Sequence, residues 1–80
     1  MKKKEELNEL EILGKTISHL RKEKGLSLEK LAYEMEISKG NLSDIENGKK
    51  NPTFTTLKKI AEGLEISLSE LILEIEGRLI

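Results

Sequence analysis

Apolar residues recur at steps of three and four along almost the whole chain, which is the spacing of one face of an α-helix. Glycine, proline, serine and threonine interrupt this pattern, and such residues end one helix or cap the next. The pattern predicts five helices, which lie between Glu6 and Gly25, from Ser27 to about Met35, from Ser38 to Gly48, from Thr53 to about Leu64, and from Ser67 or Ser69 toward Leu79. No segment shows sustained strand alternation. We therefore expect an all-α fold that forms one domain over residues 1–80.

The residues that should face the core are almost all aliphatic, because Tyr33 and Phe54 are the only aromatic residues in the sequence. Helical phase puts Phe54 on the inward side of the fourth helix and Tyr33 on the outer side of the second.

The last helix carries a longer apolar stripe than the core of a small domain uses, and an apolar remainder suggests a partner surface. Residues 67–80 are therefore expected to form a dimerisation helix and tail. The expected interface residues are Leu71, Ile75, Leu79 and Ile80. A frayed tail, or a cap over the monomer's own core, is the alternative.

The second and third predicted helices are short and are separated by about three residues, which is the arrangement of a helix-turn-helix. It spans residues 28–47, and Ala32 is small at the point where the two helices would cross closely. Leu42 and Ile45 of the third helix face inward. The opposite face carries short polar residues beside lysines, and such a face suits the major groove of DNA.

Charge is unevenly distributed along the chain, although its formal net value is only −1. Residues 38–59 carry five lysines and two acids, whereas residues 60–80 carry five glutamates and one arginine. Phosphate responds to the local field rather than to the total charge, so the helix-turn-helix region can face DNA while the acidic C-terminal region faces solvent. Residues 1–6 are expected to form a disordered basic arm.

The residue content argues against several other functions. The sequence has no cysteine and one histidine, His19, so we expect neither a disulfide framework nor a metal site. It shows no phosphate-cradling glycine loop and no evident pair of catalytic carboxylates, so we expect no enzyme activity and no cofactor or small-molecule effector. There is no secretory signal and no apolar run long enough to span a bilayer, so the expected location is the cytoplasm, without a membrane partner.

Three segments, "GKTISHLRKEKGLSLEKLA", "ISKGNLSDIENGKKNP" and "LKKIAEGLEISLSEL", resemble the Cro/lambda-repressor type of helix-turn-helix domain, the xenobiotic-response-element class. The resemblance covers roughly residues 13–73 and consists of several motifs in register, which makes it specific. It implies a five-helix domain that binds double-stranded DNA, usually as a homodimer on a palindromic operator.

Helical phase and the resemblance together suggest roles for the polar residues of this region. Residues expected to read bases are Lys39, Gly40, Ser43 and Asp44. Residues expected to contact the DNA backbone are Ser27, Lys30, Asn41, Asn47, Lys49, Lys50, Thr53 and Thr55. Asp44 is open to two interpretations. Its carboxylate can accept a hydrogen bond from a cytosine amino group, or it can be a solvated acid that repels wrong DNA sites.

Glu46 lies on the inward side of the third helix by periodicity, and in the family that the chain resembles the corresponding glutamate pairs with an arginine, here Arg21. We expect a structural ion pair between them, because a partly buried carboxylate needs a partner. Two positions depart from the family pattern. Leu28 replaces a glutamine that holds a phosphate in many relatives, and Glu36 replaces a glycine that is often left-handed in the turn.

The leading hypothesis is a dimeric, sequence-specific regulator of transcription, bacterial or phage-derived and associated with the nucleoid. A small repressor, a restriction–modification controller and an antitoxin all fit a domain of this size. The alternative is a protein-interaction module, antitoxin- or adaptor-like, that keeps the helical fold and binds DNA weakly or not at all. The slightly acidic net charge, Asp44 and Leu28 favour this alternative.

Overall fold

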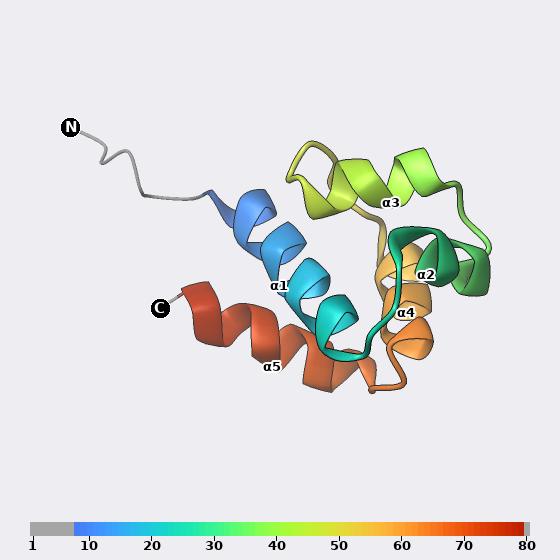
Figure 1. The fold of residues 1–80 in the computed structure, drawn as a ribbon. Helices are drawn as coiled ribbons and strands as arrows, with labels where there is room; N and C mark the ends of the chain where they lie inside the picture. The colour runs from blue at the N-terminus through green and yellow to red at the C-terminus, as the bar shows by residue number, and fades with distance from the viewer. Residues whose placement is uncertain (1–7, 80) are drawn as a thin grey trace.

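The computed structural model describes residues 8–79, and this range contains five α-helices and no strand (Figure 1). The helices are α1 (Glu9–Glu23), α2 (Leu28–Met35), α3 (Lys39–Glu46), α4 (Phe54–Gly63) and α5 (Leu68–Leu79). The predicted all-α fold with a helix-turn-helix is confirmed. The basic arm expected at residues 1–6 lies outside the described residues, as does Ile80. Between residues 8 and 79, no helix combines the length and the apolar content needed to cross a bilayer.

The sequence correctly predicts the hydroxyl caps of α2, α3 and α4. The side chains of Ser27, Ser38 and Thr53 accept hydrogen bonds from backbone N–H groups in the first turns of α2, α3 and α4. Gly25 and Gly48 follow α1 and α3 with φ angles of +72° and +75°. This left-handed conformation costs glycine little, so the chain can turn sharply at both points.

Reciprocal caps begin the first and last helices, α1 and α5. Ser67, rather than Ser69, caps α5. The backbone N–H of Glu70 donates to Ser67 Oγ at 3.0 Å, and the N–H of Ser67 donates to the Glu70 carboxylate at 2.8 Å. Asn8 and Glu11 form the same arrangement at the start of α1. A capping box satisfies two backbone donors that the helix itself leaves unpaired.

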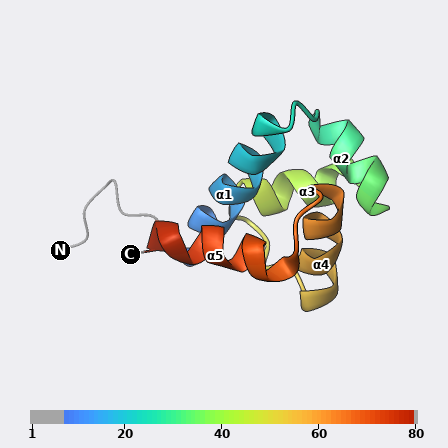
Figure 2. The same cartoon turned by 90° about the horizontal axis from the view of Figure 1, so that it is seen from below.

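The helices enclose one aliphatic core. α1 packs against α3 and α5, α2 packs against α3 and α4, and α4 packs against α5. Each helix contributes a side chain that is completely buried: Ile17, Leu31, Leu42, Ile60 and Leu71 all expose 0% of their surface. The N-terminal end of α1 and the C-terminal end of α5 lie together in both views (Figures 1 and 2).

The expected apolar remainder on α5 is partly wrong. Leu71 is fully buried and Ile75 exposes only 7%, so both belong to the core of the monomer. The reason is that α5 packs against both α1 and α4, which covers more of its length than the sequence suggested. The large apolar side chains that α5 does expose are Leu73, at 66%, and Leu79, at 41%.

The prediction for Phe54 is also wrong. Helical phase puts it on the inward side of α4, but the residue is 68% exposed. It is the first residue of α4, and the first turn of this helix lies at the edge of the bundle (Figure 2). The core contacts of α4 begin later, with the half-buried Leu57 and the buried Ile60. Tyr33 is 82% exposed, as its phase on α2 predicts.

α1 approaches the end of α3 closely at Gly14. A Cβ atom added to Gly14 would lie 2.5 Å from the carbonyl oxygen of Glu46, and closer still to that of Ile45. Both neighbours are backbone atoms, which cannot rotate away as the tip of a side chain can. Glycine at this position therefore sets the distance between α1 and α3.

We expect Gly14→Ala to destabilise the protein by about 2 kcal/mol, because overpacking against fixed atoms forces backbone shifts. Gly77→Ala is the matched control. Gly77 lies within α5, and an added Cβ would meet nothing within 4 Å. It should stabilise the protein by up to about 1 kcal/mol, through helix propensity alone. Chemical denaturation of both variants tests this, and similar effects at the two positions would contradict the close approach.

Candidate nucleic-acid interface

The turn between α2 and α3 has the geometry of a helix-turn-helix. Glu36 ends α2 in a left-handed conformation, with φ 59° and ψ 41°. The backbone N–H of Ile37 reaches back to the carbonyl oxygen of Ala32 at 3.1 Å. Ser38 then caps α3 by accepting a hydrogen bond from the N–H of Asn41 at 3.0 Å. The chain therefore keeps the left-handed turn without a glycine, at a conformational cost of about 1–2 kcal/mol.

One face of α3 packs into the core and the other is free. Leu42 and Ile45 are buried, whereas Lys39 and Gly40 are exposed. In Figure 1, α3 runs along the upper edge of the molecule with the other helices on one side of it. A helix presented in this way can enter the major groove of DNA without rearrangement of the fold.

The four residues expected to read bases all lie on α3 away from the core. Lys39 and Gly40 occupy its first turn, and Ser43 and Asp44 are half-buried one turn later. An added Cβ at Gly40 would meet nothing within 4 Å, so the backbone there is open to a close approach from outside. Among the described residues, the Asp44 carboxylate has no hydrogen-bond or ion-pair partner. It is available to a donor from outside the protein.

The residues expected to contact the DNA backbone lie on α2, on α3 and the loop after it, and at the start of α4. Ser27 and Lys30 are exposed at the start of α2. Asn41 lies on α3 itself, and Asn47, Lys49 and Lys50 follow its end. Thr53 and Thr55 are exposed at the start of α4. The structure therefore places these residues at the starts of α2 and α4, on α3 and in the loop that follows α3.

Two of these side chains are tied to α3 by hydrogen bonds. Lys50 Nζ donates to Asn41 Oδ1 at 2.8 Å, which connects the loop after α3 to the helix. Asn47 Nδ2 donates to the carbonyl oxygen of Ser43 at 2.9 Å. These hydrogen bonds reduce the number of conformations that the side chains must give up on binding.

An ion pair between Arg21 and Glu46 joins α1 to the end of α3. Arg21 Nε donates to Glu46 Oε2 at 2.8 Å, and a terminal guanidinium nitrogen donates to Oε1 at 3.1 Å. The other terminal nitrogen donates to the carbonyl oxygen of Leu26 at 2.8 Å. The two side chains are only 11% and 9% exposed. The expected ion pair therefore forms, in a bidentate geometry.

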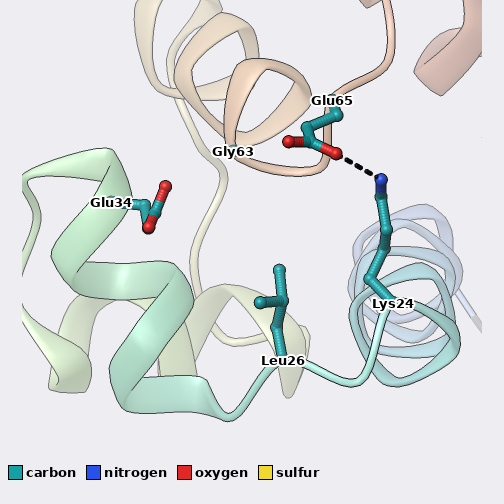
Figure 3. Close-up of a pocket in the computed structure, with 5 residues that line it drawn as sticks. All are labelled: Lys24, Leu26, Glu34, Gly63 and Glu65. Carbon is teal, nitrogen blue, oxygen red and sulfur yellow. Dashed lines mark hydrogen bonds and ion pairs between the residues drawn. The ribbon is translucent and has the colours of Figure 1, made fainter.

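A surface pocket lies between the end of α1, α2 and the end of α4 (Figure 3). It is lined by Lys24, Leu26, Glu34, Gly63 and Glu65. Lys24 Nζ lies 2.8 Å from Glu65 Oε1, and this hydrogen bond holds the pKa of Glu65 below its ordinary value. The pair links the end of α1 to the turn before α5, where Glu65 itself adopts a positive φ of 62°. The Lys24–Glu65 pair therefore fits a structural role, because it joins two turns.

Sequence reasoning missed two features of this region. An ion pair joins Glu29 on α2 to Lys39 on α3, and its partners are separated by a turn whose geometry no local spacing reveals. The close approach at Gly14 was missed because a glycine inside a helical pattern does not say which backbone it touches. By contrast, the capping box of Asn8 and Glu11 has a readable spacing of three residues.

Comparisons with known proteins extend over most of the chain. A family model described as Helix-turn-helix matches residues 17–71. The Control protein C.MunI of a Mycoplasma species is 43% identical over 72 residues, which cover 88% of this chain and 97% of that protein. The crystal structure of the clp gene regulator ClgR from C. glutamicum has a TM-score of 0.85 at 29% identity, with 94% of this chain and 97% of that chain covered. The wild-type restriction-modification controller protein C.Esp1396I has a TM-score of 0.84 at 29% identity, covering 94% and 96%.

We expect Glu46→Ala to lower the free energy of unfolding by about 3 kcal/mol, because it leaves the Arg21 guanidinium buried without its anion. Glu74→Ala is the control. It breaks an ion pair with Arg78 whose side chains are 49% and 37% exposed, and it should cost less than about 1 kcal/mol. Urea denaturation measures both, and equal costs would show that burial does not strengthen the Arg21 pair.

Proposed function

The chain belongs to the helix-turn-helix family, and we propose that it regulates transcription as a homodimer on a palindromic operator. It is a sequence-specific DNA-binding transcriptional regulator, like the regulators and controller proteins to which it is similar. The observation that carries the proposal is the free outer face of α3, held in place by a buried ion pair and flanked by lysines. A protein of this function works where the DNA is, which makes the cytoplasm its expected location.

In the proposed complex, α3 lies in the major groove with its N-terminal half toward the base edges. Lys39 can donate to O6 and N7 of a guanine. Gly40 has open space above it, so the backbone can approach the DNA closely. Ser43 adds a hydroxyl that can donate or accept a hydrogen bond. These residues supply the sequence-specific contacts.

Asp44 is the proposed reader of a cytosine. Its carboxylate lacks a partner among residues 8–79, and it can accept a hydrogen bond from a cytosine N4 amino group. A base contact also explains why an acid is placed on a face that otherwise approaches phosphate. At a guanine or a thymine, whose major-groove edges present acceptors and no amino donor, the same charge would be left unpaired and would weaken binding.

The remaining polar residues fix the register of the protein on the DNA backbone. From the start of α2, Ser27 and Lys30 contact phosphates of one DNA strand. Lys49 and Lys50 reach the backbone from the loop after α3, together with Asn41 and Asn47 of the helix and its end. Thr53 and Thr55 add hydroxyl groups and the N-terminus of α4, which favours an anion. Interactions of this kind carry affinity and its salt dependence rather than sequence preference.

The proposed dimer forms through the exposed apolar residues of α5. Leu73 is 66% exposed and Leu79 is 41% exposed, on a helix whose surroundings are acidic and therefore unsuited to DNA. A twofold contact there would place two copies of α3 about one DNA turn, or 34 Å, apart. This surface keeps Leu79 from the one expected from the sequence and uses Leu73 in place of Leu71 and Ile75, which are buried in the monomer.

The alternative function is a protein-interaction module with weak DNA binding. Leu28 favours it, because it stands at the start of α2 where many relatives present a phosphate ligand, and it is half-buried against the core. The salt dependence of DNA binding separates the two functions. Charge-driven binding to phosphate weakens steeply with salt, whereas an interaction module would show little binding at any salt concentration.

Selection of bound sites from a random DNA library should recover an inverted repeat with half-sites about one helical turn apart. Asp44→Ala should change the preferred base at one position in each half-site, with a loss of discrimination of about 1–3 kcal/mol. Asn51→Ala in the loop after α3 is a control that should leave the sequence preference unchanged. Absence of any enriched site at low salt would overturn the proposed function.

Leu73→Asp should weaken self-association at least about tenfold, because it places a charge in an apolar contact. The fold should tolerate the change, since the side chain is 66% exposed in the monomer. Tyr33→Asp is the control, because it alters another exposed apolar side chain, on α2. Sedimentation equilibrium measures both variants. A wild-type protein that stays monomeric at all concentrations, or equal association of the two variants, would exclude this dimer surface.

A further inference from the structure

An ion pair joins the two helices of the helix-turn-helix on their solvent side. Lys39 Nζ lies 2.9 Å from Glu29 Oε2, and within residues 8–79 this is the one ion pair between α2 and α3. The hydrogen bond from Lys39 holds the pKa of Glu29 below its ordinary value. Lys39 is the first residue of α3 and one of the residues proposed to read bases. Its partner therefore bears on how DNA is recognised.

Stability of the fold does not account for this pair. The Lys39 side chain is 58% exposed and that of Glu29 is 66% exposed. Ion pairs in such positions contribute little to folding, because water and salt screen them. The pair does restrict the position of the Lys39 ammonium group. That group would otherwise sample many positions on a flexible four-carbon stem.

The restriction changes which groups on DNA the ammonium can meet. A free lysine binds any nearby phosphate as a point charge, whatever the sequence. A carboxylate beside the lysine repels phosphate. It also takes one of the three N–H donors and leaves two, which is the number that O6 and N7 of a guanine accept. The pair thus favours a base edge over the backbone as the next partner of Lys39.

We propose that Glu29 is a positioning residue that holds Lys39 toward base edges and away from phosphates, and so raises the discrimination between operator and other DNA. The inference rests on the proposed function, because it requires α3 to lie in the major groove. It adds a specificity determinant on α2, one helix away from the surface that reads the bases.

The test compares Glu29→Gln with Glu36→Gln. Glu36 directly follows α2, is also solvent-exposed and forms no ion pair within residues 8–79, so its replacement removes the same charge without releasing a lysine. Both changes are also made in a Lys39→Ala background. The measurements are dissociation constants for the selected operator and for a shuffled duplex of equal length, each at several salt concentrations. A denaturation midpoint for every variant checks that the fold is intact.

Glu29→Gln should bind the shuffled duplex more tightly than Glu36→Gln does. Its salt slope should be steeper by about 0.9, because the released Lys39 ammonium neutralises one more phosphate. Its operator-to-shuffled preference should fall at least about fivefold. In the Lys39→Ala background the two glutamine variants should behave alike. This last result distinguishes an action through Lys39 from a general effect of charge.

Two outcomes would overturn the positioning role, and they differ from failure of the proposed function. If the wild-type protein discriminates but the two glutamine variants are equal, Glu29 does not position Lys39. If Glu29→Gln keeps its effect without Lys39, the carboxylate acts on DNA directly. A wild-type protein that prefers the operator to no measurable degree would overturn the proposed function itself, and the positioning role with it.

Discussion

The bidentate ion pair between Arg21 and Glu46 fixes α3, and every proposed base contact depends on the position of that helix. The same guanidinium also binds the carbonyl oxygen of Leu26, so it connects α1, the chain before α2 and the last residue of α3. Gly14 brings the backbone of α1 against the carbonyl groups at the end of α3, at the same crossing. The ion pair is costly to break, because that would leave a buried charge without its partner. The contact at Gly14 leaves no space for the two backbones to move closer. Together they fix the position of α3 relative to α1.

On the solvent side of α3, polar side chains are tied to one another rather than left free. Lys39 is paired with Glu29, Lys50 with Asn41, and Asn47 with Ser43. These interactions are weak individually, yet they limit the conformations that the interface must order on binding. The acidic residues concentrated after position 60 add a second constraint, because they leave the region around α3 as the part of the chain suited to phosphate.

Features that depend on neighbours in sequence could be predicted, and features that depend on helix packing could not. The caps at Ser27, Ser38 and Thr53 and the outer face of α3 follow from local spacing, and the structure has them. The Arg21–Glu46 pair needed family resemblance in addition, since twenty-five residues separate its partners. Ile75 and Phe54 were misjudged because helical phase gives the direction of a side chain but not where the neighbouring helices end. The Glu29–Lys39 pair is likewise set by the angle of the turn at Glu36.

The core that takes one fully buried side chain from each helix has a consequence for cooperativity. One cluster contains all five of these side chains, Ile17, Leu31, Leu42, Ile60 and Leu71. Detaching any one helix therefore exposes apolar surface on the others. Detachment of α3 alone would expose core side chains of its neighbours as well as its own, which opposes independent melting of this helix. Regulation by melting and refolding of the recognition helix alone is therefore disfavoured, because that helix has no separate core of its own.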